Sequence, residues 1–253
     1  MRFDELNIPA QVLEGIRAAG FTDCTPVQAL TLPDALKGKD IAAQAQTGTG
    51  KTAAFLVPVF SRMLELPHPG QGPSPRALII APTRELVVQI EAEARVLGGP
   101  AGFKILSVFG GIDYDKQRRE LQNGVDILIG TPGRLIDYLK QKVYSLKKTQ
   151  FLVIDEADRM FDMGFISDLR FLLRRMAPYN ERQSFLFSAT LSTRVMELSY
   201  EHMNAPEKFV VTPEQMTVEK IEQTLYHVGK EEKMGLLLGM LRHEGEGRYL
   251  IFC

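Results

Sequence analysis

The residues with the clearest chemistry form one short stretch, AQTGTGKT, from Ala45 to Thr52. An apolar run precedes it and a stretch of helical period follows, so we expect a strand, a loop and a helix in that order. Glycines allow successive backbone N–H groups to point at one anion, and the helix start adds the positive end of its dipole. Lys51 adds a point charge, and the Thr52 hydroxyl can bind Mg²⁺. The stretch matches the phosphate-binding pattern G-x-x-x-x-G-K-[ST] except for Ala45 at the first glycine. A flexible turn before an ordinary helix is the plainer alternative.

A second group of reactive residues follows an apolar run in FLVIDEAD, which contains Asp155, Glu156 and Asp158. These carboxylates should lie at the carboxyl end of a buried strand, where open α/β sheets bind ligands. We expect Asp155 to hold, largely through water, the Mg²⁺ that Thr52 also reaches, and Glu156 to orient or deprotonate an attacking water. An acidic helix start is the alternative, but a phosphate loop upstream favours a hydrolytic site with Lys51, Asp155 and Glu156 as catalytic residues.

The elements that must position these residues alternate along the chain. Short apolar runs predict strands at 40–44, 76–82, 104–109, 125–130, 151–155, 184–190 and 208–212. Amphipathic stretches predict helices that include 52–65, 84–97, 132–141 and 192–203. Such alternation is typical of a parallel sheet with helices on both faces.

The composition limits the classes of partner. Lys and Arg total 30 against 31 Asp and Glu, a net charge of −1, so nucleic-acid binding would depend on locally placed groups. No apolar run approaches the roughly 18 residues of a membrane helix, and no signal-peptide pattern is visible, so we expect a cytoplasmic protein with no membrane partner. The two cysteines, Cys24 and Cys253, predict neither a disulfide framework nor a zinc site.

Six short motifs resemble those of the DEAD-box RNA helicases in order and spacing. They are AQTGTGKT, PTREL (82–86), GG (110–111), TPGR (131–134), DEAD (155–158) and SAT (188–190). The resemblance implies a RecA-like α/β domain, ATP and Mg²⁺ as cofactors, RNA as partner, and ATP-dependent local unwinding of RNA duplexes. The sequence between the motifs is more similar to the bacterial RhlB-type branch than to other branches of the family. This similarity implies an RNA-decay assembly as a partner of the intact protein.

The resemblance also implies an ATP site with an adenine pocket. GFTDCTPVQ, residues 20–28, matches the family's adenine-reading motif, in which Gln28 would bond the adenine edge and Thr25 would support the loop. Phe3 stands where the family places an aromatic that stacks on adenine. Such a pocket should reject guanine, because its polar groups would be left unpaired. The remaining ATP contacts implied are those of the phosphate loop: Ala45, Gln46, Thr47, Gly48, Thr49, Gly50, Lys51 and Thr52.

RNA contacts and a coupling element are implied in the same way. The residues assigned to the RNA backbone are Arg84, Gly111, Thr131 and Arg134. None is suited to reading base edges, so binding should be independent of sequence and sensitive to salt. Ser188 and Thr190 would link the nucleotide state to RNA binding through hydrogen bonds to Asp158. RMFDMGF, residues 159–165, resembles the start of a strand-bending helix, although a buried Met and Phe stripe is an equally good reading.

We expect residues 1–211 to form the RecA-like domain, and 212–253 to be a linker and the truncated start of a second such domain. The pattern HRxGRxxR of the family's second domain is missing. Since loss of an arginine finger costs roughly 10³ to 10⁵ in rate, this chain should bind nucleotide but hydrolyse it poorly alone. The apolar segments after 212 should pack on the domain or on a neighbouring molecule, a route to self-association. A P-loop NTPase that acts on DNA or protein, and an ATP-gated RNA clamp, remain as alternatives.

Overall fold

The computed structural model describes residues 1–46, 48–70, 72–111, 113–211, 224–243 and 247–251. The chain divides into two compact units, Met1–Thr212 and Pro213–Cys253. The boundary expected at 212–220 lies outside the described residues, so the assignment of the second unit to a further domain stays a prediction. In the described part of the chain, no helix is long and apolar enough to span a membrane.

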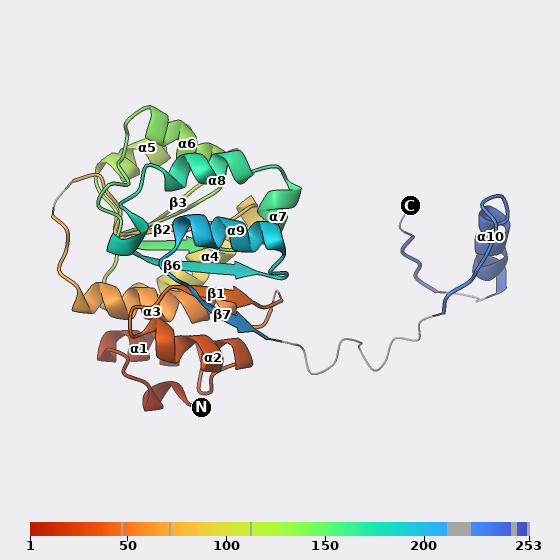
Figure 1. Cartoon of the computed structure of the whole chain (residues 1–253), viewed down its shortest axis with the longest axis horizontal. Helices are drawn as coiled ribbons and strands as arrows, with labels where there is room; N and C mark the ends of the chain where they lie inside the picture. Colours follow the sequence, from red (N-terminus) through yellow and green to blue (C-terminus); the bar gives the residue numbers. More distant parts are fainter. Residues whose placement is uncertain (47, 71, 112, 212–223, 244–246, 252–253) are drawn as a thin grey trace. The chain divides into compact units, whose positions relative to one another are not determined.

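One sheet organises the first unit (Figure 1). Its seven strands are all parallel and are ordered β3-β4-β2-β5-β6-β1-β7. The strands are β1 Ile41–Gln44, β2 Ala77–Ile80, β3 Ile105–Val108, β4 Ile127–Gly130, β5 Phe151–Ile154, β6 Gln183–Ser188 and β7 Glu207–Val210. The parallel sheet expected from the sequence is therefore confirmed.

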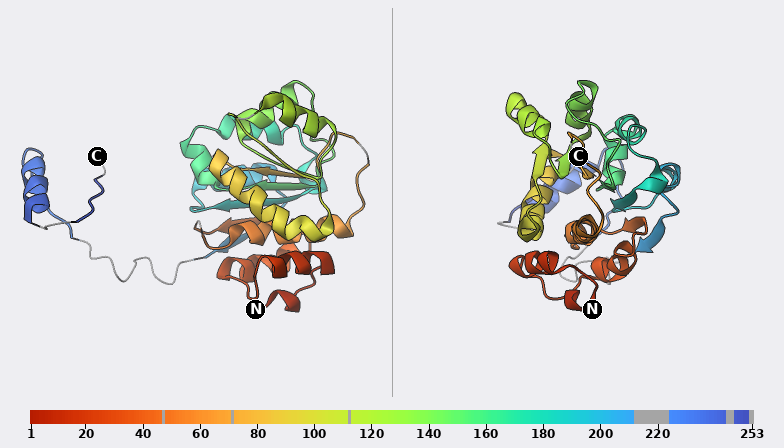
Figure 2. Two further views of the ribbon diagram at one scale, coloured as in Figure 1. Left: turned by 180° about the vertical axis from the view of Figure 1, so that it is seen from behind. Right: turned by 90° about the vertical axis from the view of Figure 1, so that its left-hand side faces the viewer.

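Helices cover both faces of this sheet (Figure 2). One face carries α1 Ala10–Ala18, α2 Pro26–Ala35, α3 Lys51–Glu65 and α4 Arg84–Gly98. The other carries α5 Tyr114–Gln122, α6 Pro132–Lys140, α7 Ala157–Asp162, α8 Ile166–Leu173 and α9 Thr193–His202. Three short 3₁₀ helices complete the unit: η1 Phe3–Glu5, η2 Gly99–Ala101 and η3 Tyr179–Glu181.

The strand residues explain why both faces are covered. Neighbouring side chains along a strand point to opposite faces, so a strand that is apolar at every position needs two layers of helices. Val153 and Phe185 belong to the core under α1–α4. Leu152 and Leu186 belong to the core under α5–α9. Each of these side chains is fully buried, which stabilises the fold by about 2 kcal/mol per residue.

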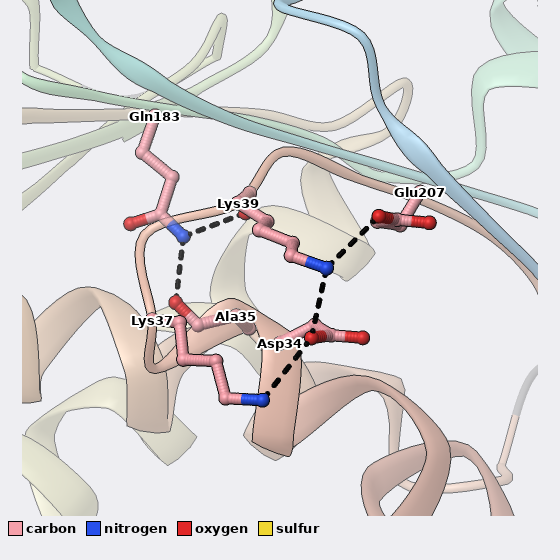
Figure 3. Close-up of polar contacts among 6 residues, drawn as sticks. All are labelled: Asp34, Ala35, Lys37, Lys39, Gln183 and Glu207. Atoms are coloured by element: carbon pink, nitrogen blue, oxygen red, sulfur yellow. Dashed lines mark hydrogen bonds and ion pairs between the residues drawn. The ribbon is translucent and has the colours of Figure 1, made fainter.

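A polar network fixes the start of β1 (Figure 3). The Gln183 amide at the start of β6 donates to the carbonyls of Ala35 and Lys39, at 2.7 and 2.8 Å. The Lys39 ammonium lies 3.2 Å from Asp34 and 3.0 Å from Glu207 on the edge strand. Water screens these exposed ion pairs, so the buried amide of Gln183 is the firmer tie. The network anchors β1, whose other end carries the phosphate loop.

The second unit contains one described helix, α10 Lys233–His243, which has no buried residue. Large apolar side chains are exposed on both sides of it, among them Leu225 and Leu250, each 80% exposed.

Candidate functional site

Most of the candidate residues follow the carboxyl ends of strands, and the strand order divides these into two groups. Phe3, Thr25 and Gln28 instead precede β1. Strands β1, β5 and β6 are neighbours and lead into the phosphate loop, DEAD and SAT. Strands β2, β3 and β4 are also neighbours and lead into PTREL, GG and TPGR. One edge of the sheet therefore presents the expected nucleotide-binding residues (the nucleotide half) beside the expected RNA-binding residues (the RNA half), and ligands of open α/β sheets bind at this edge.

The phosphate loop joins β1 directly to α3. Ala45 continues the strand, because its N–H donates to the Ser188 carbonyl at 2.9 Å, and its side chain is buried. Gly48 and Gly50 have φ values of +83° and +86°, which side chains rarely adopt. Thr49 lies between them, and its hydroxyl donates to the carbonyl of Gln46 at 2.7 Å. Thr47 lies outside the described residues.

Lys51, the first residue of α3, faces Asp155 inside the protein. Their side chains are only 6% and 2% exposed, and Nζ lies 3.6 Å from Oδ1. The Lys51 ammonium has no hydrogen-bond partner among the described residues. Burial raises the pKa of Asp155 to about 6, although the charge of Lys51 opposes this change. A buried cation without a hydrogen-bonding partner is costly, and a phosphate anion would supply one.

A third carboxylate, Glu93 of α4, lies beside Thr52 and Asp155 and was not anticipated. Burial raises the pKa of Glu93, a hydrogen bond with the Thr52 side chain lowers it, and the charge of Asp155 raises it further. The sequence did hold a signal: Glu93 follows Ile90 by three positions and precedes Leu97 by four, which places an acid on the buried stripe of the helix.

Glu156 occupies strained backbone between β5 and α7. Its φ and ψ are both 52°, in the left-handed region that costs a non-glycine residue about 1 kcal/mol or more. The Glu156 N–H donates to Asp155 Oδ1 at 2.9 Å, and its carboxylate lies 3.2 Å from the Arg159 guanidinium. The chain therefore leaves the extended conformation of β5 at Glu156.

Gln28 and Phe3 are both expected to bind adenine, but they have different surroundings in the structure. Gln28 is 3% exposed; its Oε1 accepts from the Thr25 N–H at 2.9 Å, and its Nε2 donates to the Gly50 carbonyl at 3.0 Å. The amide thus braces the phosphate loop and keeps one N–H and one lone pair for a ligand. Phe3 is only 2% exposed and belongs to the core under α1–α4. Its stacking on adenine stays a prediction.

The three coupling residues do meet. The Asp158 N–H donates to the Ser188 hydroxyl at 3.1 Å. The Thr190 N–H and hydroxyl both point to Asp158 Oδ2, at 3.1 and 3.4 Å. These hydrogen bonds tie the SAT segment to α7, which begins within DEAD at Ala157.

The candidate RNA residues converge on one groove of about 550 Å³. Arg84, Thr131 and Arg134 line it. Gly111 lies beneath the Arg84 guanidinium with a φ of +89°, and a Cβ there would overlap that guanidinium. Gly111 therefore has two reasons to be glycine, its backbone conformation and the closeness of Arg84.

Two tyrosines that the sequence did not single out hold Arg134. Its guanidinium carbon lies 4.8 Å from the centroid of the Tyr114 ring and 5.5 Å from that of Tyr138. Arg134 also donates to the Tyr138 hydroxyl at 3.2 Å, and that hydroxyl donates to the Tyr114 carbonyl at 2.8 Å. Tyr138 follows Arg134 by four positions on α6, a spacing that places both on one helix face.

The RMFDMGF segment divides between its two readings. Met160 is fully buried in the core under α5–α9. Met163 and Phe165 instead line the groove beside Arg84 and Arg134, and Met163 is 46% exposed.

The fold and the two halves of the edge define a phosphate-loop α/β domain with a neighbouring groove that candidate RNA-binding residues line. Residues 25–198 match the DEAD/DEAH box helicase family, and the chain belongs to that family. A protein of Xanthomonas axonopodis pv. citri called ATP-dependent RNA helicase RhlB is 55% identical over 99% of this chain and 44% of its own length. One of the same name from Vibrio vulnificus is 53% identical over 100% of this chain and 58% of its own length.

A solved structure described as a hypothetical ATP-dependent RNA helicase from Sulfolobus tokodaii is also similar. It is 33% identical, with a TM-score of 0.71 over 81% of this chain and 57% of that chain. The similarity to RhlB-type helicases expected from the sequence is confirmed by these matches. The chain spans about half the length of the curated relatives it matches.

Proposed function

We propose that this chain forms the ATP-binding and RNA-contacting part of an enzyme that uses ATP to separate short RNA duplexes. The observation that carries the proposal is the Lys51 ammonium, buried without a hydrogen-bond partner beneath the phosphate loop and 3.6 Å from Asp155. The names of the relatives and the groove beside this site support RNA as the partner.

In this proposal the phosphates lie against Lys51 and the backbone N–H groups of the loop from Ala45 to Thr52. Glu156 orients the attacking water and accepts its proton. That role requires its carboxylate to leave the Arg159 guanidinium, which is 57% exposed and therefore weakly held. Gln28 contacts adenine with the remaining N–H and lone pair of its amide while it keeps its hold on Gly50.

The donors at the site fit a magnesium ion. The Thr52 hydroxyl and the Asp155 carboxylate are oxygen ligands of the kind that Mg²⁺ prefers. No group of three or more His, Cys, Asp or Glu that could hold a metal exists among the described residues, so water and phosphate oxygens would complete the set. A bound Mg²⁺ would neutralise phosphate charge. Asp155 would then be ionised, because the cation offsets the burial that raises its pKa.

RNA would follow the groove through its phosphates and 2′-hydroxyls. Arg84 and Arg134 supply the charge, while Gly111 and Thr131 allow close approach of the backbone. Ser188 and Thr190 are hydrogen-bonded to Asp158 within the nucleotide half, and through these bonds they would link the nucleotide state to RNA binding. We further propose a cytoplasmic location, an RNA-decay assembly as partner, and self-association through the exposed apolar residues of 224–251.

The test is ATP turnover by the 253 residues, with and without single-stranded RNA, against the Glu156→Gln variant. Because the chain spans about half the length of its relatives, we expect it to bind nucleotide but to hydrolyse ATP at a rate close to that of the Glu156→Gln variant. RNA-accelerated turnover that Glu156→Gln abolishes would show a complete active site in this chain alone. DNA of the same sequence is the control for the nucleic acid. Equal binding of DNA would favour the NTPase alternative, and RNA binding that never leads to turnover in any longer form would favour the clamp.

A further inference from the structure

A patch of positive charge lies where the end of α6 meets α8. Phe171 of α8 lies at its centre, beside a hollow of about 450 Å³. The hollow is lined by Ile166, Ser167, Arg170, Phe171, Arg174 and Arg175. The Phe171 patch is defined here as Phe171 together with Lys140, Arg170, Arg174 and Arg175.

The ring of Phe171 holds two of these cations in place. The Arg175 guanidinium carbon lies 3.5 Å from the ring centroid, and its Nη1 donates to the Phe171 carbonyl at 2.9 Å. The Lys140 ammonium at the end of α6 lies 5.3 Å from the same centroid. Cations are attracted to an aromatic face without being neutralised by it. The ring therefore fixes the positions of two charges that remain able to bind an anion.

Most of the charge of the patch is uncompensated. Arg170 lies 3.1 Å from Glu201, so that charge is offset. Lys140, Arg174 and Arg175 are exposed, and none of them forms an ion pair with a carboxylate of the described residues. The chain as a whole has a net charge of −1, so this local excess does not follow from its composition. A fixed group of uncompensated cations indicates a polyanionic partner.

The patch is continuous with the proposed RNA groove. Arg134, near the start of α6, lines the groove, and Lys140 ends the same helix in the patch. Phe165 lines the groove, and the next residue, Ile166, lines the hollow of the patch. An RNA strand that leaves the groove in this direction meets the patch next.

We propose that the Phe171 patch binds the phosphates of RNA just outside the groove, so that the RNA footprint of the chain is longer than the groove itself. This inference rests on the proposed RNA binding. Arginines stacked on an aromatic ring, with further N–H groups directed outward, suit phosphate oxygens. An acidic protein segment could use the same charges, but the continuity with the groove favours RNA.

The test compares a short single-stranded RNA that fills only the groove with one several nucleotides longer at each end. Fluorescence anisotropy at several salt concentrations gives the Kd of each RNA and its salt dependence, for the wild-type chain and for the variant with Lys140→Gln, Arg174→Gln and Arg175→Gln. The matched control is Lys104→Gln with Lys147→Gln and Lys148→Gln, which removes the same charge from exposed residues before β3 and β5, at the opposite edge of the sheet.

We expect the patch variant to bind the longer RNA about tenfold more weakly and to lower its salt slope by about 2, because three phosphate contacts are lost. The short RNA and the control variant should keep wild-type affinity. Equal affinity of wild type and patch variant for the longer RNA would overturn the inference and leave an acidic protein as the partner to test. Equal losses for both lengths would overturn it as well, since they would reflect general charge. If the wild type binds neither RNA, the proposed function itself fails.

Discussion

Replacement of Gln28 by alanine tests whether the phosphate loop depends on its brace. The substitution removes two hydrogen bonds, from the Thr25 N–H at 2.9 Å and to the Gly50 carbonyl at 3.0 Å. A hydrogen bond of this kind contributes about 1 kcal/mol net. The bond to Gly50 orders the loop itself, so every nucleotide should bind with a Kd about fivefold higher, whatever its base. Loss of the bond from the Thr25 N–H should lower the thermal stability of the chain.

Calorimetric titrations with ADP and GDP, both with Mg²⁺, separate the brace from base reading. The affinity for GDP should fall about fivefold through the brace alone. The affinity for ADP should fall at least as much, and the excess measures adenine contact. Gln11→Ala, an exposed glutamine on α1, is the matched control and should change neither value. Unchanged GDP affinity in the Gln28→Ala variant would refute the role of the brace.

Two further predictions concern the RNA half and the fold. Gly111→Ala places a side chain at a φ of +89° against the guanidinium of Arg84, so RNA affinity should fall about tenfold while ADP affinity stays constant. In Gly110→Ala the new Cβ would lie 3.3 Å from that guanidinium, so RNA affinity should fall less than in Gly111→Ala. Equal losses of RNA affinity in the two variants would contradict the packing argument. Burial raises the pKa of Asp40 to about 6, so the folded state keeps a proton that the unfolded state loses above about pH 4. The free energy of unfolding from urea titrations should therefore fall as pH rises from about 4 to about 6, by up to about 1.4 kcal/mol per pH unit more than in Asp40→Asn. If the free energy of unfolding changed with pH in the same way in wild type and Asp40→Asn, the role of Asp40 would be refuted.

The sequence predicted the sheet well because both its signals are local. The central strands contain short runs that are apolar at consecutive positions, and the helices between strands carry one apolar stripe. Strand ends were less accurate: the expected strand at 184–190 ends at Ser188, because Thr190 turns away to bond Asp158. Whether a buried run continues or turns depends on partners that lie far away in the sequence.

Contacts that the motifs imply are present in the structure, whereas contacts that depend on packing were not anticipated. The roles of the candidate residues stay predictions. Lys51 and Asp155 lie together as their motifs imply, but their shared burial depends on β6 lying between β1 and β5. Glu93 belongs to no motif and acquires its position only when α4 packs near the loop. The burial of Phe3 likewise depends on how η1 packs against the core, which its spacing from Gly20 does not reveal.

The most direct test of the central claim is the affinity of the chain for ATP, with Mg²⁺, measured by calorimetry in the wild type and in Lys51→Met. If the buried ammonium is a phosphate ligand, the wild type should bind one ATP and the variant should bind at least about 10-fold more weakly, as expected for loss of a charged hydrogen bond. Lys51→Met keeps most of the side-chain volume, and circular dichroism should show an unchanged fold. Equal ATP affinity in both proteins, or no binding by the wild type, would contradict the account.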